Sequence, residues 1–287
     1  MSVHAVRPAP AVVRAPSLDR GPHRSFLADV VIEHGPRELL GRLFLRADTA
    51  LREKGLLLSY CDFDHLIAVN KANADTWKPI IPLFDPEHSD IEGRNGHALI
   101  ARNANGEVVC ATACKFYDFN GTNLKDEVES LRFIYRDPEA SRRPGERVLV
   151  SAPSAASMSG TAVYAGALWY RPDYRGKAIM PILSTLTRGL WFTRWRPERG
   201  FSFMSSDLIA ANRHLVGHMP NIDWAVEMYD TPVVPGGVYN GALIWSTDSD
   251  NLAMIQQFVM GHSASRNTEV DRLIDNRPAD QKRTVLL

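Results

Sequence analysis

Cysteine is scarce in this chain of 287 residues, which contains only Cys61, Cys110 and Cys114. A small and odd number of cysteines argues against a disulfide framework and is typical of a reducing compartment. Cys110 and Cys114 lie four residues apart in a predicted strand and therefore face one side, but no further ligand residues flank them. We expect buried thiols and no metal site.

Net charge is also absent, because 33 Lys and Arg residues balance 33 Asp and Glu residues. Without a field of one sign, the chain has no general attraction to nucleic acid or to an anionic membrane. The uncharged stretch 148–170 contains Pro153, Gly160 and several serines, and is too polar for a membrane-spanning helix. We therefore expect a cytoplasmic protein with neither a nucleic-acid nor a membrane partner.

The first 24 residues have no apolar run of the kind found in secretory signals. They are rich in Pro, Ala and Arg, and the first acidic residue is Asp19, which leaves a transit peptide as an alternative. The prolines in this segment disfavour an amphipathic helix, so we expect residues 1–24 to form a disordered arm. We expect a single domain over residues 25–261 and a polar, flexible tail over residues 262–287.

Hydrophobic spacing predicts an alternation of helices and strands along this domain. The clearest element is a hairpin, in which His97–Arg102 and Glu107–Tyr117 flank an Asn105-Gly106 turn. The predicted helices are 37–54, 64–77, 122–136, 178–195 and 210–218, and the other predicted strands are 56–60, 161–170, 201–205, 224–229 and 241–246. Mixed strands with interspersed helices predict an α/β or α+β fold.

The segment after the strand Thr161–Tyr170 carries the clearest chemical signal. It runs through Tyr174-Arg175-Gly176-Lys177 into the helix that begins near Ala178. The first turn of a helix leaves N–H groups unpaired and carries partial positive charge, and the two effects together favour a bound phosphate. Gly176 and Ala178 allow a close approach to the backbone, and Arg175 and Lys177 add charged donors.

Residues 167–179, Ala-Leu-Trp-Tyr-Arg-Pro-Asp-Tyr-Arg-Gly-Lys-Ala-Ile, resemble the acyl-CoA signature of the GNAT (acyl-CoA N-acyltransferase) superfamily. The resemblance implies a mixed, mostly antiparallel central sheet flanked by helices, with residues 118–160 as a helical insertion. It also implies a pantetheine-binding strand end and a phosphate loop. The implied cofactor-binding residues are Leu168, Trp169, Tyr170, Arg175, Gly176, Lys177, Ala178, Ile179, Met180 and Asn212.

The chain departs from that family in three respects. Met180 stands where the phosphate loop usually has a small residue. About forty residues separate the third and fourth strands of the pattern, where the family has a short turn. The glutamate base of the fourth strand is missing from 161–170, and Met219 occupies the position of the helical tyrosine acid. The candidate catalytic groups near the strand ends are Asp207, His214 and His218, with Ser205 and Ser206 as hydrogen-bond donors. Of these, we take Asp207 and His218 as the catalytic candidates.

The resemblance implies transfer of an acetyl or other acyl group from acetyl-CoA or another acyl-CoA to an amine of a small molecule or protein. Two alternatives remain open. The missing glutamate and tyrosine also fit a non-catalytic relative that binds a ligand or a partner, and the insertion leaves room for a larger acyl donor. An exposed, apolar final strand such as Ala242–Trp245 could pair with a second copy, which leaves a homodimer open.

Overall fold

The computed structural model describes residues 24–216, 219–261 and 268–275, so all but the last residue of the predicted arm lies outside this part. Eight strands form one sheet in the order β1-β2-β3-β5-β6-β8-β7-β4. The strands are β1 (Leu57–Cys61), β2 (Gly96–Arg102), β3 (Val108–Asp118), β4 (Arg147–Val150), β5 (Thr161–Tyr170), β6 (Arg199–Ser205), β7 (Asn221–Tyr229) and β8 (Val238–Thr247). Only β5 and β6 pair in parallel, which confirms the predicted mixed, mostly antiparallel sheet.

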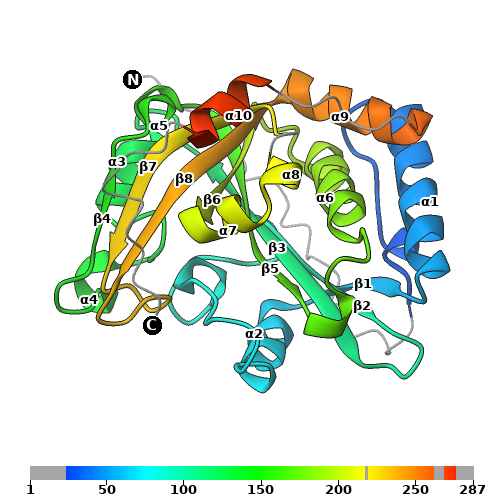
Figure 1. Cartoon of the computed structure of the whole chain (residues 1–287), viewed down its shortest axis with the longest axis horizontal. Coiled ribbons are helices and arrows are strands. Elements are labelled where there is room, and N and C mark those ends of the chain that lie inside the picture. Colours follow the sequence, from blue (N-terminus) through cyan, green and yellow to red (C-terminus); the bar gives the residue numbers. More distant parts are fainter. Residues whose placement is uncertain (1–23, 217–218, 262–267, 276–287) are drawn as a thin grey trace, which may run out of the picture.

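One face of the sheet, which we call the α6 face, is covered by most of the long helices (Figure 1). These helices are α1 (Arg37–Glu53), α6 (Met180–Arg194) and α9 (Asp248–Met260). The shorter helices α7 (Ser206–Ala211), α8 (Arg213–Val216) and α10 (Thr268–Asp275) lie on the same face. Leucines at helical spacing in α1 and α6, such as Leu43 and Leu186, are fully buried between helix and sheet. The predictions of helices over 37–54 and 178–195 are therefore confirmed.

The opposite face, which we call the insert face, is covered by α2 (Phe63–Ala72), the short helix η2 (Pro82–Phe84) and residues 118–160. These last residues, the insert, form α3 (Leu124–Glu129), α4 (Pro138–Ser141), β4 and α5 (Pro153–Ser157). The predicted helix over 122–136 is thus too long. It ends at Glu129, and Leu131 then takes a left-handed φ of 64°, which a helix cannot continue through.

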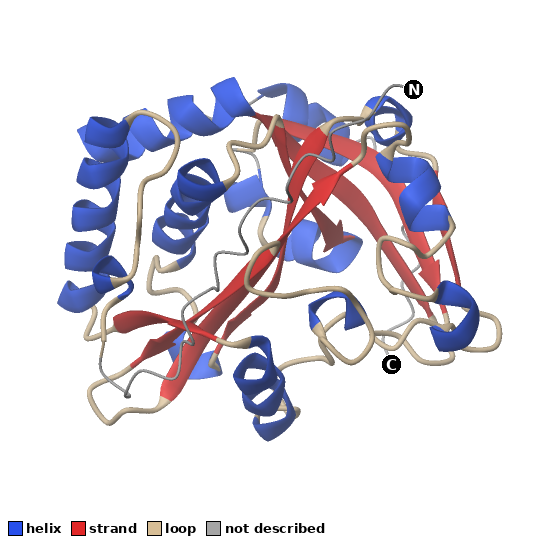
Figure 2. Cartoon of the chain, turned by 180° about the vertical axis from the view of Figure 1, so that it is seen from behind, coloured by secondary structure: helices blue, strands red, loops and turns tan. Residues whose placement is uncertain are grey.

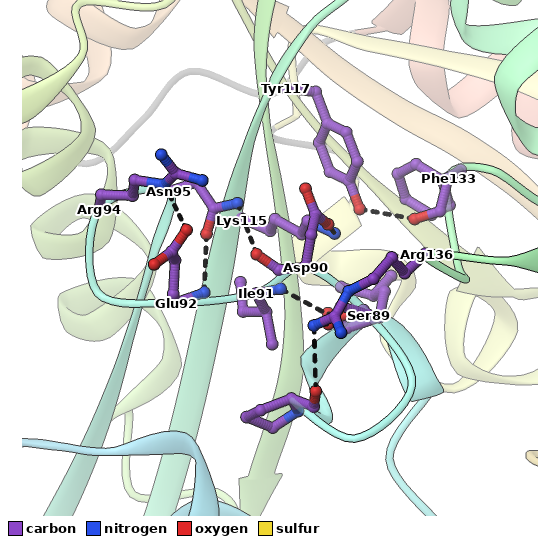
Figure 3. A network of polar contacts seen from close by, with 12 residues as sticks. Ser89, Asp90, Ile91, Glu92, Arg94, Asn95, Lys115, Tyr117, Phe133 and Arg136 are labelled. Atoms are coloured by element: carbon purple, nitrogen blue, oxygen red, sulfur yellow. Dashed lines mark hydrogen bonds and ion pairs between the residues drawn. The ribbon is translucent and has the colours of Figure 1, made fainter.

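A polar network fixes the insert against β3 (Figure 3). Lys115 on β3 is only 2% exposed, and its Nζ lies 2.5 Å from Oδ1 of Asp90. Burial lowers the pKa of Lys115, and the Asp90 carboxylate partly offsets this effect. From the insert, Arg136 donates to the Ser89 carbonyl at 2.5 Å, and the Tyr117 hydroxyl donates to the Phe133 carbonyl at 2.8 Å. These contacts join three separate segments on the insert face.

Two expectations about the C-terminal part are wrong. Residues 242–245 belong to β8, which pairs with β6 on one side and β7 on the other, so this segment is not an edge open to a second copy. Within the predicted flexible tail, residues 268–275 form α10, whose Asp275 pairs with Arg213 at 2.5 Å. Both errors arise from contacts between distant segments, which the local sequence pattern does not contain.

All three thiols are buried, as expected. No helix among the described residues has the length and apolar character that a membrane crossing needs.

Candidate functional site

The two central strands separate partway along the sheet. β5 pairs with β6 only at Ala162–Tyr164, opposite Arg199–Phe201, although both strands continue beyond that point. From there β5 stays with β3 and β6 stays with β8 (Figure 2). We call the resulting gap between β5 after Tyr164 and β6 after Phe201 the fork. A strand that continues without a partner presents backbone N–H and C=O groups to whatever fills the gap.

A β-bulge lies on β5 beside the fork. Ala167 has a left-handed φ of 50°, and the pairing of β3 with β5 shifts register at the same place. The bulge places Gly166 and Ala167 both on the insert face and turns Leu168 toward the α6 face, where it is 48% exposed. Bulges of this kind re-aim side chains and are frequent next to functional sites.

Of the three residues predicted to line a pantetheine arm, the structure places two inside the protein. Trp169 is 3% exposed and stacks on Trp77 with ring centroids 5.0 Å apart, so its side chain belongs to the insert-face core. The Tyr170 ring packs in the core of the α6 face, and its buried hydroxyl has no hydrogen-bond partner among the described residues. Burial, with the nearby Cys110, raises the pKa of Tyr170. Only Leu168 presents its side chain to solvent at the fork.

β5 leads through the short helix η3 (Pro172–Tyr174) into an exposed loop before α6. Gly176 and Ala178 have left-handed φ values of 74° and 52°, whereas Ile179 is right-handed at −82°. Adjacent left- and right-handed residues turn successive N–H groups toward one concave side, which favours an anion. Among the described residues, no protein acceptor is found for the amides of 176–180. Ile179 is buried and anchors this turn in the α6-face core.

The loop carries two cations that lack an ion pair within the described residues. Lys177 lies over the Tyr174 ring at 4.2 Å, and no carboxylate is within ion-pair distance of its Nζ. Arg175 is partly committed to the fold, because its guanidinium donates to the carbonyls of Tyr170 and Thr76. Arg171, by contrast, is paired with Asp173 and Glu107, so it is neutralised locally.

The predicted catalytic groups are not brought together. Asp207 is exposed in the first turn of α7, two residues after β6 ends, and makes no ion pair with a described residue. His218 lies outside the described residues. Asn212 stands between α7 and α8, where its side-chain amide donates to the Leu208 carbonyl at 2.9 Å. It therefore caps the end of α7 and also precedes the next short helix.

Two hollows in the described surface lie away from the predicted cofactor segment. One of about 410 Å³ is lined by Ser206, Arg213, Trp224 and Asp275, behind α7. The other, of about 230 Å³, lies where Gly35, Phe192 and Asp248 approach. Because neither is lined by residues 165–180, the candidate site rests on the free strand edge and loop, not on a closed cavity.

Sequence reasoning missed the tyrosines on the insert side of the fork. Tyr164 lies on β5 in the last pair before the strands separate, and the backbone of Phe203 on β6 lies near enough to its hydroxyl to lower the pKa of Tyr164, against the larger effect of burial. The partly buried Tyr239 of β8 lies close enough to Tyr164 that the two phenols interact electrostatically. The only sequence signal was Gly166 two residues after Tyr164 and Gly241 two residues after Tyr239, each of which leaves space for a ring.

No family model matches this chain, and no curated protein matches it. Among solved structures, the chain is similar to spermidine N-acetyltransferase from Vibrio cholerae in complex with CoA and spermine, at 10% identity and a TM-score of 0.39, over 69% of this chain and 99% of that one. It is also similar to an uncharacterized protein from Bacillus halodurans, at 11% identity and a TM-score of 0.41, over 72% and 92% of the two chains. Similarity this weak identifies neither a site nor a substrate.

Proposed function

We propose that this protein is an acyl-CoA-dependent N-acyltransferase, in which the fork and the loop at 175–180 bind the CoA part of the donor. One observation supports this proposal above all others. β5 and β6 part after three paired residues, and the free edge of β5 leads directly to an exposed, cationic, left-handed loop at the start of a long helix.

The free edge suits a pantetheine arm in both length and chemistry. The six residues Ala165–Tyr170 span roughly 20 Å at about 3.3 Å per residue. Pantetheine contains two amide groups, which can pair with unpartnered strand N–H and C=O groups as an added strand would. Leu168 supplies exposed apolar surface on the α6 face of the same edge. The arm would run from the loop toward Tyr164 and place its sulfur near the narrow end of the fork.

The loop suits the pyrophosphate. Free amides at Gly176–Met180, together with the N-terminal end of α6, favour two linked phosphates, and Lys177 adds a charge that no described carboxylate holds in an ion pair. Met180, the unusual residue of the motif, is half-buried, so its side chain does not wholly occupy the outer surface of the loop.

The reaction requires an amine nitrogen to attack the thioester carbonyl at the narrow end of the fork. The C–N bond forms, the C–S bond breaks, and CoA leaves as a thiolate that takes up the proton lost by the amine. Holding donor and acceptor together would provide much of the rate. Asp207 lies past the end of β6, at the open end of the fork and six residues beyond the last β5–β6 pair. We propose that it accepts the first proton of the entering ammonium, so that a neutral amine reaches the thioester and the second proton goes to the thiolate.

Two measurements test the proposal. Titration calorimetry with CoA should show one site, and loss of the acetyl-CoA thioester should depend on an added amine. Absence of CoA binding at millimolar concentration would contradict the assignment.

A second candidate function is a non-catalytic CoA-binding protein. The observation that favours it is the absence of a carboxylate on β5, together with the exposed position of Asp207. CoA binding without thioester loss across a broad panel of monoamines, polyamines and peptide N-termini would support this alternative and exclude the enzyme.

A further inference from the structure

Two tyrosine side chains converge on the fork from strands on either side of it. Tyr164 comes from β5, and Tyr239 comes from β8, which lies beyond β6. A Cβ added to Gly166 would lie 2.8 Å from Cε1 of Tyr164, so the Tyr164 ring lies over the backbone of Gly166. A Cβ on Gly241 would meet Cε1 of Tyr239 at 2.7 Å and its hydroxyl at 3.0 Å. Each ring thus lies along its own strand, over a glycine, on the insert face.

The hydroxyl of Tyr164 stands at the narrow end of the fork. The other sides of its ring are closed by aromatic contacts with Phe133, Phe201 and Phe84, at centroid distances of 5.1, 5.4 and 5.9 Å. The hydroxyl lies near the backbone of Phe203, two residues past the last β5–β6 pair, and this neighbour lowers the pKa of Tyr164 against the larger effect of burial. In a continuous sheet the backbone of β6 would pair with the neighbouring strand here, so the phenol lies where strand pairing is lost.

A tyrosine hydroxyl has a proton to donate, whatever it accepts. No described residue is found as an acceptor for the Tyr164 O–H, and burial raises the pKa of Tyr164 well above 10, so the group stays protonated at neutral pH. Tyr239 is likewise protonated, because burial and the neighbouring Tyr164 raise its pKa. The narrow end of the fork therefore contains neutral hydrogen-bond donors and no described carboxylate.

We propose that Tyr164 donates a hydrogen bond from its hydroxyl to the carbonyl oxygen of the acyl thioester, with Tyr239 orienting it from the opposite side. This inference rests on the proposed function, which places the thioester at the narrow end of the fork. As the amine attacks, negative charge develops on that oxygen, and a preorganised donor in a buried setting stabilises it. Tyr164 keeps its proton throughout, so it changes nothing in the balance of the reaction.

The test uses the full chain with acetyl-CoA carrying ¹³C at the acetyl carbonyl, and needs no acceptor amine. Isotope-edited infrared spectroscopy reports the carbonyl stretch of the bound donor, and hydrogen bonding lowers this frequency. In the unsubstituted protein the frequency should fall relative to free acetyl-CoA. In Tyr164→Phe most of that shift should disappear, while the affinity for CoA changes by less than about threefold, because only the hydroxyl is removed.

Tyr117→Phe is the matched control. Tyr117 is a partly buried tyrosine of the same aromatic cluster, but its hydroxyl donates to the Phe133 carbonyl (Figure 3). It should keep the full carbonyl shift. Tyr239→Phe should reduce the shift partially. Once an acceptor is known, Tyr164→Phe should lower kcat by about 100-fold, the usual effect of removing one such donor.

The outcomes separate this inference from the proposed function. If acetyl-CoA does not bind the unsubstituted protein, the proposed function fails and this inference fails with it. If acetyl-CoA binds and Tyr164→Phe keeps the full carbonyl shift, only the role of Tyr164 is overturned. Should Tyr164→Phe fail to fold, 3-fluorotyrosine at position 164 replaces it. A stronger donor should lower the carbonyl frequency further, and an unchanged frequency would refute the contact.

Discussion

The two edges of β5 differ sharply. On one edge, β5 pairs with β3 from Thr161 opposite Asp118 to Tyr170 opposite Cys110. On the other edge, it pairs with β6 for three residues and then stands free. One edge of β5 is therefore fully paired within the sheet, whereas the other edge presents backbone groups without a partner strand. We conclude that substitutions on the paired edge should affect stability, whereas those on the free edge should affect binding.

The largest effect is expected where the free edge ends, in the loop. Arg175→Glu combined with Lys177→Glu should weaken CoA binding by about 100-fold or more, since each charge-assisted contact contributes about 1.5–3 kcal/mol. Calorimetry measures the affinity, and circular dichroism checks the fold. Arg37→Glu with Arg42→Glu on α1 makes the same change in net charge and should leave the affinity intact. Equal affinity in both double variants would refute the loop as the phosphate site.

The insert-face core behind β5 should respond in stability alone. Trp77→Ala removes the ring stacked on Trp169 and leaves a cavity under β5, which should lower the free energy of unfolding by about 3–5 kcal/mol in urea titrations. Measured where the variant is folded, CoA affinity should stay within about threefold. A loss of affinity as large as that of the loop variant would show that this side also serves the ligand.

A smaller effect is expected at Leu168. Leu168→Glu places a charge where the apolar part of the pantetheine arm should lie, and CoA affinity should fall by about tenfold, which corresponds to about 1.4 kcal/mol. Leu149→Glu on β4 is the matched control, because the two leucines are 48% and 46% exposed. The idea fails if both variants bind CoA equally well.

The smallest expected effect is a dependence of the free energy of unfolding on pH, caused by a histidine in the paired part of the sheet. His97 on β2 is buried between Cys114, Tyr60 and Trp195. Burial, followed by the charge of Arg194, lowers the pKa of His97 to about 3. The unfolded chain binds this proton near pH 6.5. The contribution to stability is therefore complete above pH 6.5 and is lost as the pH falls toward 3, by roughly 1 kcal/mol per pH unit.

Urea titrations of the unsubstituted protein between pH 7 and 5 measure this slope, and His97→Phe should flatten it. An equally steep slope in His97→Phe would assign the pH dependence to other groups. CoA affinity, measured at pH 7, should be unaffected by the substitution, because His97 has no contact with the free edge.

The sequence predicted best those elements whose signal is local. The Asn105-Gly106 hairpin, the apolar stripe of α1 and the strand–loop–helix at 161–195 all depend on neighbouring residues, and all are present. Whether the predicted phosphate loop binds a phosphate stays a prediction. The sequence predicted a close approach to the backbone at Gly176 and Ala178, whereas their left-handed φ values come from the structure.

The features that were missed depend on contacts between distant segments. β8 lies inside the sheet because β7 returns outside it, which its apolar sequence cannot distinguish from an edge position. Trp169 and Tyr170 alternate as a pantetheine-lining strand should, yet Trp77 and the α6-face core cover both rings. Tyr164 and Tyr239 lie 75 residues apart in sequence (239 minus 164), and only the order of the strands in the sheet brings them together.

The most direct test of the free edge is calorimetry of the unsubstituted protein with CoA, beside pantetheine and ADP as separate ligands. We expect one CoA site, weaker binding of each part alone, and loss of the ADP signal in the Arg175→Glu, Lys177→Glu variant. No heat and no rise in melting temperature with CoA at millimolar concentration would show that the gap beside β5 does not receive this ligand.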